Sequence, residues 1–99
     1  MSDVRDSVFA DIRAERERQI NKEGWTEEHD DEHGKGEMAV AAALYALADS
    51  DCDPDAFLDL LQALWPWDEK WWKPKDPEHN LIVAGALIAA ELERRRRAK

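Results

Sequence analysis

The segment between residues 23 and 37 concentrates the side chains of this sequence that are best suited to chemistry. It reads EGWTEEHDDEHGKGE and contains seven carboxylates, two histidines and a single basic residue, Lys35. So many like charges repel one another unless water or a cation screens them. Carboxylates combined with imidazoles suit Mg²⁺ or Mn²⁺ and also accept Zn²⁺. The segment therefore predicts a divalent-metal site, with Mg²⁺ or Mn²⁺ as the expected cofactor. Its predicted ligands are Asp30, Asp31, His33 and Glu37.

The geometry of this site depends on whether residues 27–34 form a helix. If they do, His29 and His33 stand four residues apart and share one face. Glu15 from the preceding helix is a further candidate ligand. The alternative interpretation is a solvated acidic loop, which is what short charge runs usually form. Trp25 favours a site, because an aromatic ring beside carboxylates is typical of nucleotide binding, with a base to stack and a metal to hold phosphates.

Two kinds of catalysis match these residues. In a phosphohydrolase, the metal ion would bridge phosphate oxygens and activate a water, with Glu37 or Asp31 as the general base. The string HDDEH also fits the H-x-x-E-H pattern of inverted zinc proteases. A chain of 99 residues is short for a peptidase, and a third zinc ligand on a separate helix is not obvious. The sequence therefore favours the phosphohydrolase.

A second unusual segment, WPWDEKWWKPKDP at residues 65–77, holds four of the five tryptophans. In a small helical domain, tryptophans most often close the core or fill a dimer interface. They also provide platforms on which a base stacks, and neighbouring lysines meet phosphates. Both arrangements are compatible within one segment. The predicted nucleotide-binding residues are Trp25, Trp71, Trp72 and Lys73.

Helical patterns cover most of the remaining chain, and no strand pattern competes with them. We expect helices at residues 3–22, 37–48, 54–64 and 78–97, the last two beginning at Asp-Pro pairs. The fold class is therefore all-α, a compact bundle of about four helices. Tyr45 is expected in the core, where its hydroxyl needs one hydrogen-bond partner. The apolar stripes expected to be buried consist of Val4, Val8, Phe9 and Ile12 in the first helix, and Leu81, Ala84, Gly85, Ile88 and Leu92 in the last.

Length and composition limit the class of protein. The 99 residues are expected to form a single domain with a modest core, completed by dimerisation. The sequence has no apolar run that would span a membrane and no signal peptide, and its single cysteine, Cys52, cannot form an internal disulfide. We therefore expect a cytoplasmic protein without a membrane partner. The net charge of −9 argues against direct nucleic-acid binding, because phosphate contacts need a basic surface.

Two strings carry a resemblance to known proteins: ERERQINKEGWTEEHDDEHGKGEMAVAAALYA and WPWDEKWWKPKDPEHNLIVAGALIAAELER. They resemble small proteins encoded by phages and prophages. More distantly, the chain is similar to the MazG-like all-α NTP pyrophosphohydrolases. That resemblance implies a dimer in which glutamates and aspartates hold Mg²⁺ to cleave a nucleoside triphosphate to monophosphate and pyrophosphate. The family's Glu-x-x-Asp spacing is present at Glu28 and Asp31 and at Glu27 and Asp30, before the helix expected at residues 37–48 and not on it.

Three functions remain open from the sequence. The first is a metal-dependent pyrophosphohydrolase acting on (d)NTPs. The second is a non-catalytic protein that sequesters a nucleotide signal of host defence. The third is an inhibitor whose acidic surface occupies the nucleic-acid channel of a host protein. Clustering of the acidic residues at 23–37 beside histidines favours the first two, so a nucleotide or nucleotide-derived small molecule is the expected partner.

Overall fold

The computed structural model describes residues 2–98, with the exception of the Ser2 side chain. Within this range the chain contains five α-helices, one 3₁₀ helix and no strand. This confirms the predicted all-α class, with one more α-helix than expected. The elements in chain order are α1 (Ser2–Lys22), α2 (Glu27–Asp31), α3 (Glu37–Leu47), α4 (Pro54–Leu64), η1 (Glu69–Trp71) and α5 (Pro77–Arg97). None of the helices in residues 2–98 is both long and apolar enough to cross a bilayer.

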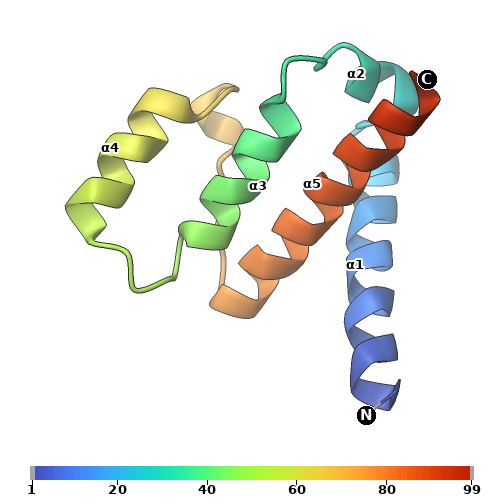
Figure 1. Cartoon of the computed structure of the whole chain (residues 1–99), viewed down its shortest axis with the longest axis horizontal. Coiled ribbons are helices and arrows are strands. Elements are labelled where there is room, and N and C mark those ends of the chain that lie inside the picture. The colour runs from blue at the N-terminus through green and yellow to red at the C-terminus, as the bar shows by residue number, and fades with distance from the viewer. Residues whose placement is uncertain (1, 99) are drawn as a thin grey trace.

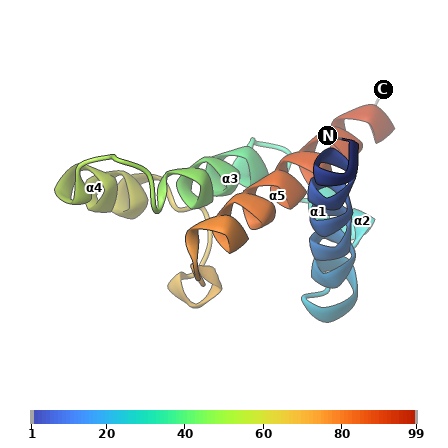
Figure 2. The same cartoon turned by 90° about the horizontal axis from the view of Figure 1, so that it is seen from below.

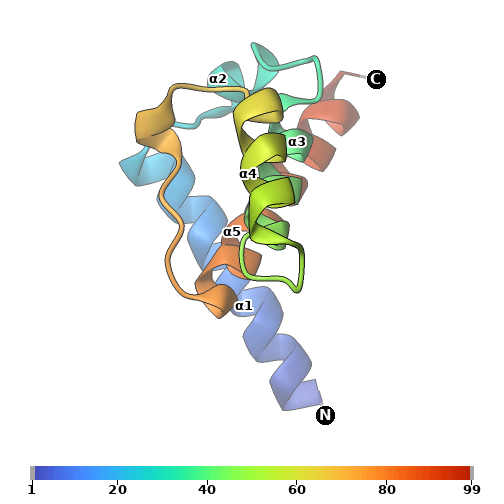
Figure 3. The same ribbon diagram turned by 90° about the vertical axis from the view of Figure 1, so that its left-hand side faces the viewer.

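Helix α5 runs through the middle of the molecule, with α3 along one side and α1 along the other (Figure 1). Seen from below, α4, α3, α5 and α1 lie side by side in that order, as a single layer (Figure 2). The molecule is correspondingly thin, at 25 Å along its shortest axis. The segment between α4 and α5 crosses one face of this layer and approaches α2 and the end of α1 (Figure 3).

Small side chains allow α3 and α5 to pack closely. Ala41 and Ala42 of α3 meet Ala84 and Leu87 of α5, and all four are buried. Tyr45 belongs to the same cluster, as the sequence predicts. Tight contact between helix backbones maximises dispersion contacts, which compensates for the small apolar area that each alanine buries.

The starts of α4 and α5 follow the predicted chemistry. The carboxylate of Asp53 accepts a hydrogen bond from the backbone N–H three residues later, at 3.0 Å, and proline occupies the first turn of α4. Asp76 caps α5 in the same way, at 2.9 Å. Each cap satisfies a backbone donor that the helix itself cannot satisfy.

The apolar stripe predicted for the first helix is not buried in the chain. Its N-terminal half extends beyond the other helices (Figures 1 and 3), so Val4, Val8 and Phe9 are exposed. Ile12 marks the point where α1 crosses α5, because a Cβ built on Gly85 would stand 3.0 Å from its side chain. The prediction failed because the helix continues past the surface that could cover it.

The stripe predicted for the last helix is likewise corrected. Ala84 is buried, but Leu81, Ile88 and Leu92 are about half exposed, and the buried leucine of α5 is Leu87. Residues 81–90 are apolar nearly all round, so their periodicity does not single out one face. Association of two copies through the exposed stripes remains a prediction.

Candidate functional site

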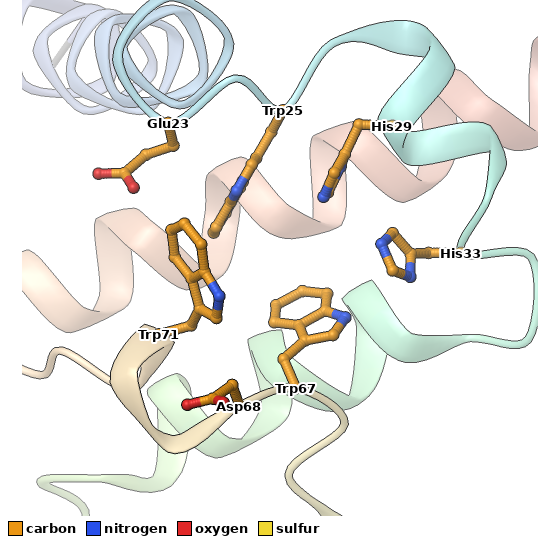
Figure 4. A pocket seen from close by; sticks show the side chains of 7 residues that line it. All are labelled: Glu23, Trp25, His29, His33, Trp67, Asp68 and Trp71. Atoms are coloured by element: carbon orange, nitrogen blue, oxygen red, sulfur yellow. The ribbon is translucent and has the colours of Figure 1, made fainter.

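The two unusual segments of the sequence meet around one cavity of about 290 Å³. One wall comes from α2 and the residues on either side of it, between α1 and α3, and the other comes from the loop that contains η1 (Figure 4). The residues that line it are Glu23, Trp25, His29, His33, Trp67, Asp68 and Trp71. Aromatic rings therefore supply five of its seven lining side chains.

Trp25 is the centre of this aromatic arrangement. Its ring centroid lies 5.7 Å from that of Trp67 and 6.1 Å from that of Trp71, at interplanar angles of 50° and 58°. His29 stacks almost parallel to Trp25, with centroids 5.9 Å apart. Tilted contacts are a favourable geometry for aromatic pairs. They also form a concave wall, because neighbouring rings meet at an angle.

Two carboxylates orient the imidazoles of this cavity. His33 Nδ1 lies 2.9 Å from a carboxylate oxygen of Glu37, and His29 Nδ1 lies 3.2 Å from one of Asp30. The hydrogen bond with His33 lowers the pKa of the Glu37 carboxyl below its ordinary value. The ring centroids of His29 and His33 are 4.6 Å apart. The two histidines thus share one face, although α2 itself ends at Asp31.

Arginines occupy the other predicted metal ligands. Asp30 is fully buried and its second carboxylate oxygen accepts a hydrogen bond from Arg16 at 2.7 Å. Asp31 forms an ion pair with Arg97 at 2.9 Å. Across residues 2–98 the structure has no group of three His, Cys, Asp or Glu side chains arranged to hold a metal ion. The predicted set of Asp30, Asp31, His33 and Glu37 is therefore not assembled.

This arrangement does not fit the expected Mg²⁺ or Mn²⁺. A Mg²⁺ ion demands near-octahedral oxygen coordination and is usually bound through one or two carboxylates that face substrate phosphates. Asp30 and Asp31 instead point toward guanidinium groups on α1 and α5. The proposed general bases, Asp31 and Glu37, are engaged with Arg97 and His33, respectively. Among the described residues, these two carboxylates are therefore engaged with other side chains and not arranged around a shared metal ion.

Tyr45 fixes the tryptophan segment onto the helix layer. Its hydroxyl accepts a hydrogen bond from the backbone N–H of Lys73 at 3.0 Å and donates one to the carbonyl of Trp71 at 3.3 Å. Burial raises the pKa of the Tyr45 hydroxyl, so the group stays protonated and able to donate. Trp72 packs on the Tyr45 ring, with centroids 4.6 Å apart. Trp72, predicted from the sequence as a nucleotide contact, lies against the core and does not line the aromatic cavity; it lines a separate hollow of about 470 Å³ together with Trp65 and Trp67.

Replacing Tyr45 with phenylalanine tests this anchor. Tyr45→Phe keeps the ring but leaves the Lys73 N–H without its acceptor, so we expect the free energy of unfolding to fall by about 1–3 kcal/mol. Urea denaturation followed by circular dichroism measures the change. A free energy of unfolding that stays within about 0.5 kcal/mol of the wild type would show that the hydroxyl does not anchor the segment.

A second cavity, of about 250 Å³, adjoins the first and shares Glu23, Trp25 and Trp71 with it. Its lining adds three cationic side chains, together with His79. These cations are Arg18, Lys73 and Lys75. Arg18 is held by Glu15 and Glu23 at 2.8–2.9 Å. The Lys73 ammonium lies 5.2 Å from the Trp71 ring centroid and 3.8 Å from a carboxylate oxygen of Glu23. The two cavities thus combine an aromatic compartment with a more cationic one.

Three of the predicted nucleotide-binding residues lie at these cavities. Trp25 and Trp71 line the aromatic cavity and Lys73 lines its neighbour; that they contact a ligand remains a prediction. Trp67, Glu23 and Asp68 are not among the predicted contacts, although Glu23 belongs to the acidic segment and Trp67 and Asp68 to the tryptophan-rich segment. The sequence thus marks the two segments, and the fold decides which of their side chains face the cavity.

Comparisons of the chain with protein-family models, with curated proteins and with solved structures found no match. The class of protein therefore has to be argued from the two cavities and the residues that line them.

Proposed function

We propose that this chain is a nucleotide-binding protein that holds a base in the aromatic cavity and phosphates in the adjoining cationic cavity. The observation that supports this most is the convergence of Trp25, Trp67 and Trp71 on one concave surface. Any of the nucleic-acid bases can stack on an aromatic side chain, because every base has a π-face. A concave surface of indole rings is complementary to a planar aromatic ligand such as a base.

The size of the aromatic cavity selects the part of the nucleotide that enters it. Its volume of about 290 Å³ lies just below the range of roughly 300–1,000 Å³ that is common for small-molecule sites. A base with its sugar fits such a volume, but a complete triphosphate does not. The phosphates would therefore lie beyond the shared wall of Trp25 and Trp71, in the second cavity.

The charges of the second cavity support this division. Lys73 and Lys75 place ammonium groups there. The carboxylates of Glu15 and Glu23, which would repel phosphate, are paired with Arg18, and Glu23 also lies 3.8 Å from the Lys73 ammonium. Lysine ammonium groups are common phosphate binders. In the aromatic cavity, by contrast, no described lining residue is lysine or arginine. The aromatic cavity therefore suits a base, and the cavity with the cationic side chains suits its phosphates.

Binding without hydrolysis is the form of this function that the contacts support. Hydrolysis would need carboxylates free to hold a metal ion or to activate a water. Asp30 and Asp31 are instead paired with Arg16 and Arg97. A protein that captures a nucleotide intact needs only the stacking surface and the cations.

Trp71→Ala is the sharpest test of this proposal. The tryptophans that pack against the core are Trp25, Trp65, Trp67 and Trp72, so Trp71 can be removed with the least damage to the fold. Loss of one stacking ring costs about 1–3 kcal/mol, which corresponds to a roughly 5- to 150-fold rise in Kd. Isothermal titration with nucleoside mono- and triphosphates, in EDTA, measures this change.

Phe9→Ala is the matched control, because Phe9 is an exposed aromatic residue of α1 outside both cavities. It should bind nucleotides with the affinity of the wild type. The proposal is wrong if no nucleotide binds the wild type, or if Trp71→Ala and the wild type bind nucleotides equally well. Circular dichroism of both variants confirms that the helices are intact.

One observation favours a second ligand class. The aromatic cavity carries two carboxylates beside its indole faces: Asp68, and Glu23, which is also paired with Arg18. Aromatic faces attract organic cations such as quaternary ammonium groups. Choline is therefore added to the titration. Saturable binding of choline that Trp71→Ala weakens, without binding of any nucleotide, would establish this alternative.

A further inference from the structure

We propose that His29 and His33 form a binding site for a divalent late transition-metal ion, such as Zn²⁺, Ni²⁺ or Cu²⁺. Their imidazoles come from successive turns of the chain, and their ring centroids are 4.6 Å apart at an interplanar angle of 57°. Both rings point into the aromatic cavity, and each presents a nitrogen at its inner tip (Figure 4). The pair thus directs two nitrogen donors toward one space.

The outer nitrogen of each ring is already assigned by its partner. His33 Nδ1 lies 2.9 Å from Glu37 and His29 Nδ1 lies 3.2 Å from Asp30. A carboxylate can only accept a hydrogen bond, so in the neutral imidazole the proton lies on Nδ1 and Nε2 keeps its lone pair for a metal ion. Histidines that bind metals show this pattern, in which a carboxylate fixes the tautomer and raises the basicity of the ligating nitrogen.

The donor type selects the metal. Imidazole nitrogen suits Zn²⁺, Cu²⁺ and Ni²⁺, whereas Mg²⁺ and Mn²⁺ prefer oxygen donors. Glu37 and Asp30 thus act on the histidines and are not metal ligands themselves. This differs from the metal site that the sequence predicts, in which both carboxylates bind the ion directly.

Two histidines leave most coordination positions of the ion open. Within residues 2–98, no third His, Cys, Asp or Glu side chain joins them as a ligand group. Water or a donor atom of a bound ligand would fill the remaining positions, which face the cavity. The metal site does not depend on the proposed nucleotide binding, since the imidazoles are in place without a ligand.

The chain offers a test with a built-in control, because it has three histidines and His79 lies outside the aromatic cavity. The chain of residues 1–99, treated with EDTA and then freed of the chelator, is titrated with NiCl₂, ZnCl₂ or CuCl₂ by calorimetry. We expect one equivalent to bind the wild type and His79→Ala. His29→Ala and His33→Ala should each lose this saturable step. Glu37→Gln should keep it with an affinity reduced roughly 10- to 100-fold.

Tryptophan fluorescence gives an independent readout on the same samples. Trp25 stacks on His29 at 5.9 Å, so bound Ni²⁺ or Cu²⁺ should quench its emission with the same stoichiometry. In the wild type, Ni²⁺ should also broaden the ring resonances of His29 and His33 but not those of His79, which tests the site without any variant. The proposal is overturned if the wild type binds no equivalent, if both alanine variants bind like the wild type, or if the His79 resonances broaden instead. Nucleotide titration in EDTA separates this result from the proposed nucleotide function.

Discussion

Arg16→Ala is expected to lower the free energy of unfolding by about 3–5 kcal/mol, because it leaves a buried carboxylate without its cation. Asp30 is fully buried, and its ion pair with Arg16 has a length of 2.7 Å. A small domain has a total stability of only about 5–15 kcal/mol. The variant should therefore lose a large fraction of its stability, which urea denaturation of wild type and variant measures directly.

Arg97→Ala is the matched control for this variant. It also removes an arginine from an ion pair with an aspartate of α2, at 2.9 Å, but the Asp31 side chain in this pair is 55% exposed. Exposed pairs contribute about 0–1 kcal/mol, so Arg97→Ala should be nearly as stable as the wild type. Equal stabilities of the two variants would show that burial of Asp30 does not decide the effect.

A double-mutant cycle separates the ion pair from simple loss of packing. Adding Asp30→Ala to Arg16→Ala removes the unpaired charge, so part of the lost stability should return. The same pair also positions the candidate site, because Arg16 donates a hydrogen bond to the carbonyl of Trp25 at 3.3 Å. We therefore expect ligand binding in the aromatic cavity to weaken together with stability in Arg16→Ala.

The sequence predicts best where the interactions are local. The caps at Asp53 and Asp76 involve a side chain and a backbone group three residues away, so the residues that make them stand together in the sequence. The burial of Tyr45 is predicted by its neighbours in the same way, because a helix that is apolar on nearly all faces is expected to be buried. The helices and their starts followed from such short-range patterns.

The acidic segment shows why the metal site was predicted differently from what the structure contains. Seen alone, its carboxylates need a cation, and a metal ion is the natural candidate. In the fold, the cations are Arg16 and Arg97, which are 14 residues from Asp30 and 66 from Asp31, respectively. No local pattern pairs residues so far apart. The charge argument was sound, but the identity of the cation depends on the tertiary structure.

The aromatic cavity combines two segments that the sequence could only single out separately. Trp25 meets Trp67 and Trp71 because α1 and α3 both pack against α5, and Tyr45 of α3 anchors the loop that follows α4. Composition identified both segments as unusual, but it could not show that they share one cavity. It also could not separate Trp72, which packs on Tyr45, from Trp71, which faces the cavity.

In helix α5, the leucine that is buried in the structure is not one of the leucines that the sequence pattern predicts to be buried. Leu87 is fully buried in the cluster between α3 and α5, whereas Leu92, part of the stripe predicted from the sequence, is 49% exposed. Leu87→Ala should lower the free energy of unfolding by about 2–5 kcal/mol, through lost apolar burial and the cavity left behind. Leu92→Ala should change it by less than about 0.5 kcal/mol, as exposed positions generally do.

Urea denaturation at two protein concentrations turns this comparison into a test of the predicted dimer as well. A large loss in Leu87→Ala alone, independent of concentration, means that the core of the single chain determines stability. If Leu92→Ala is as destabilising as Leu87→Ala, Leu92 is buried in solution by contacts that the single chain does not provide. If, in addition, the stability of the wild type rises with protein concentration, a second copy covers the exposed stripe, because association stabilises the folded state by mass action.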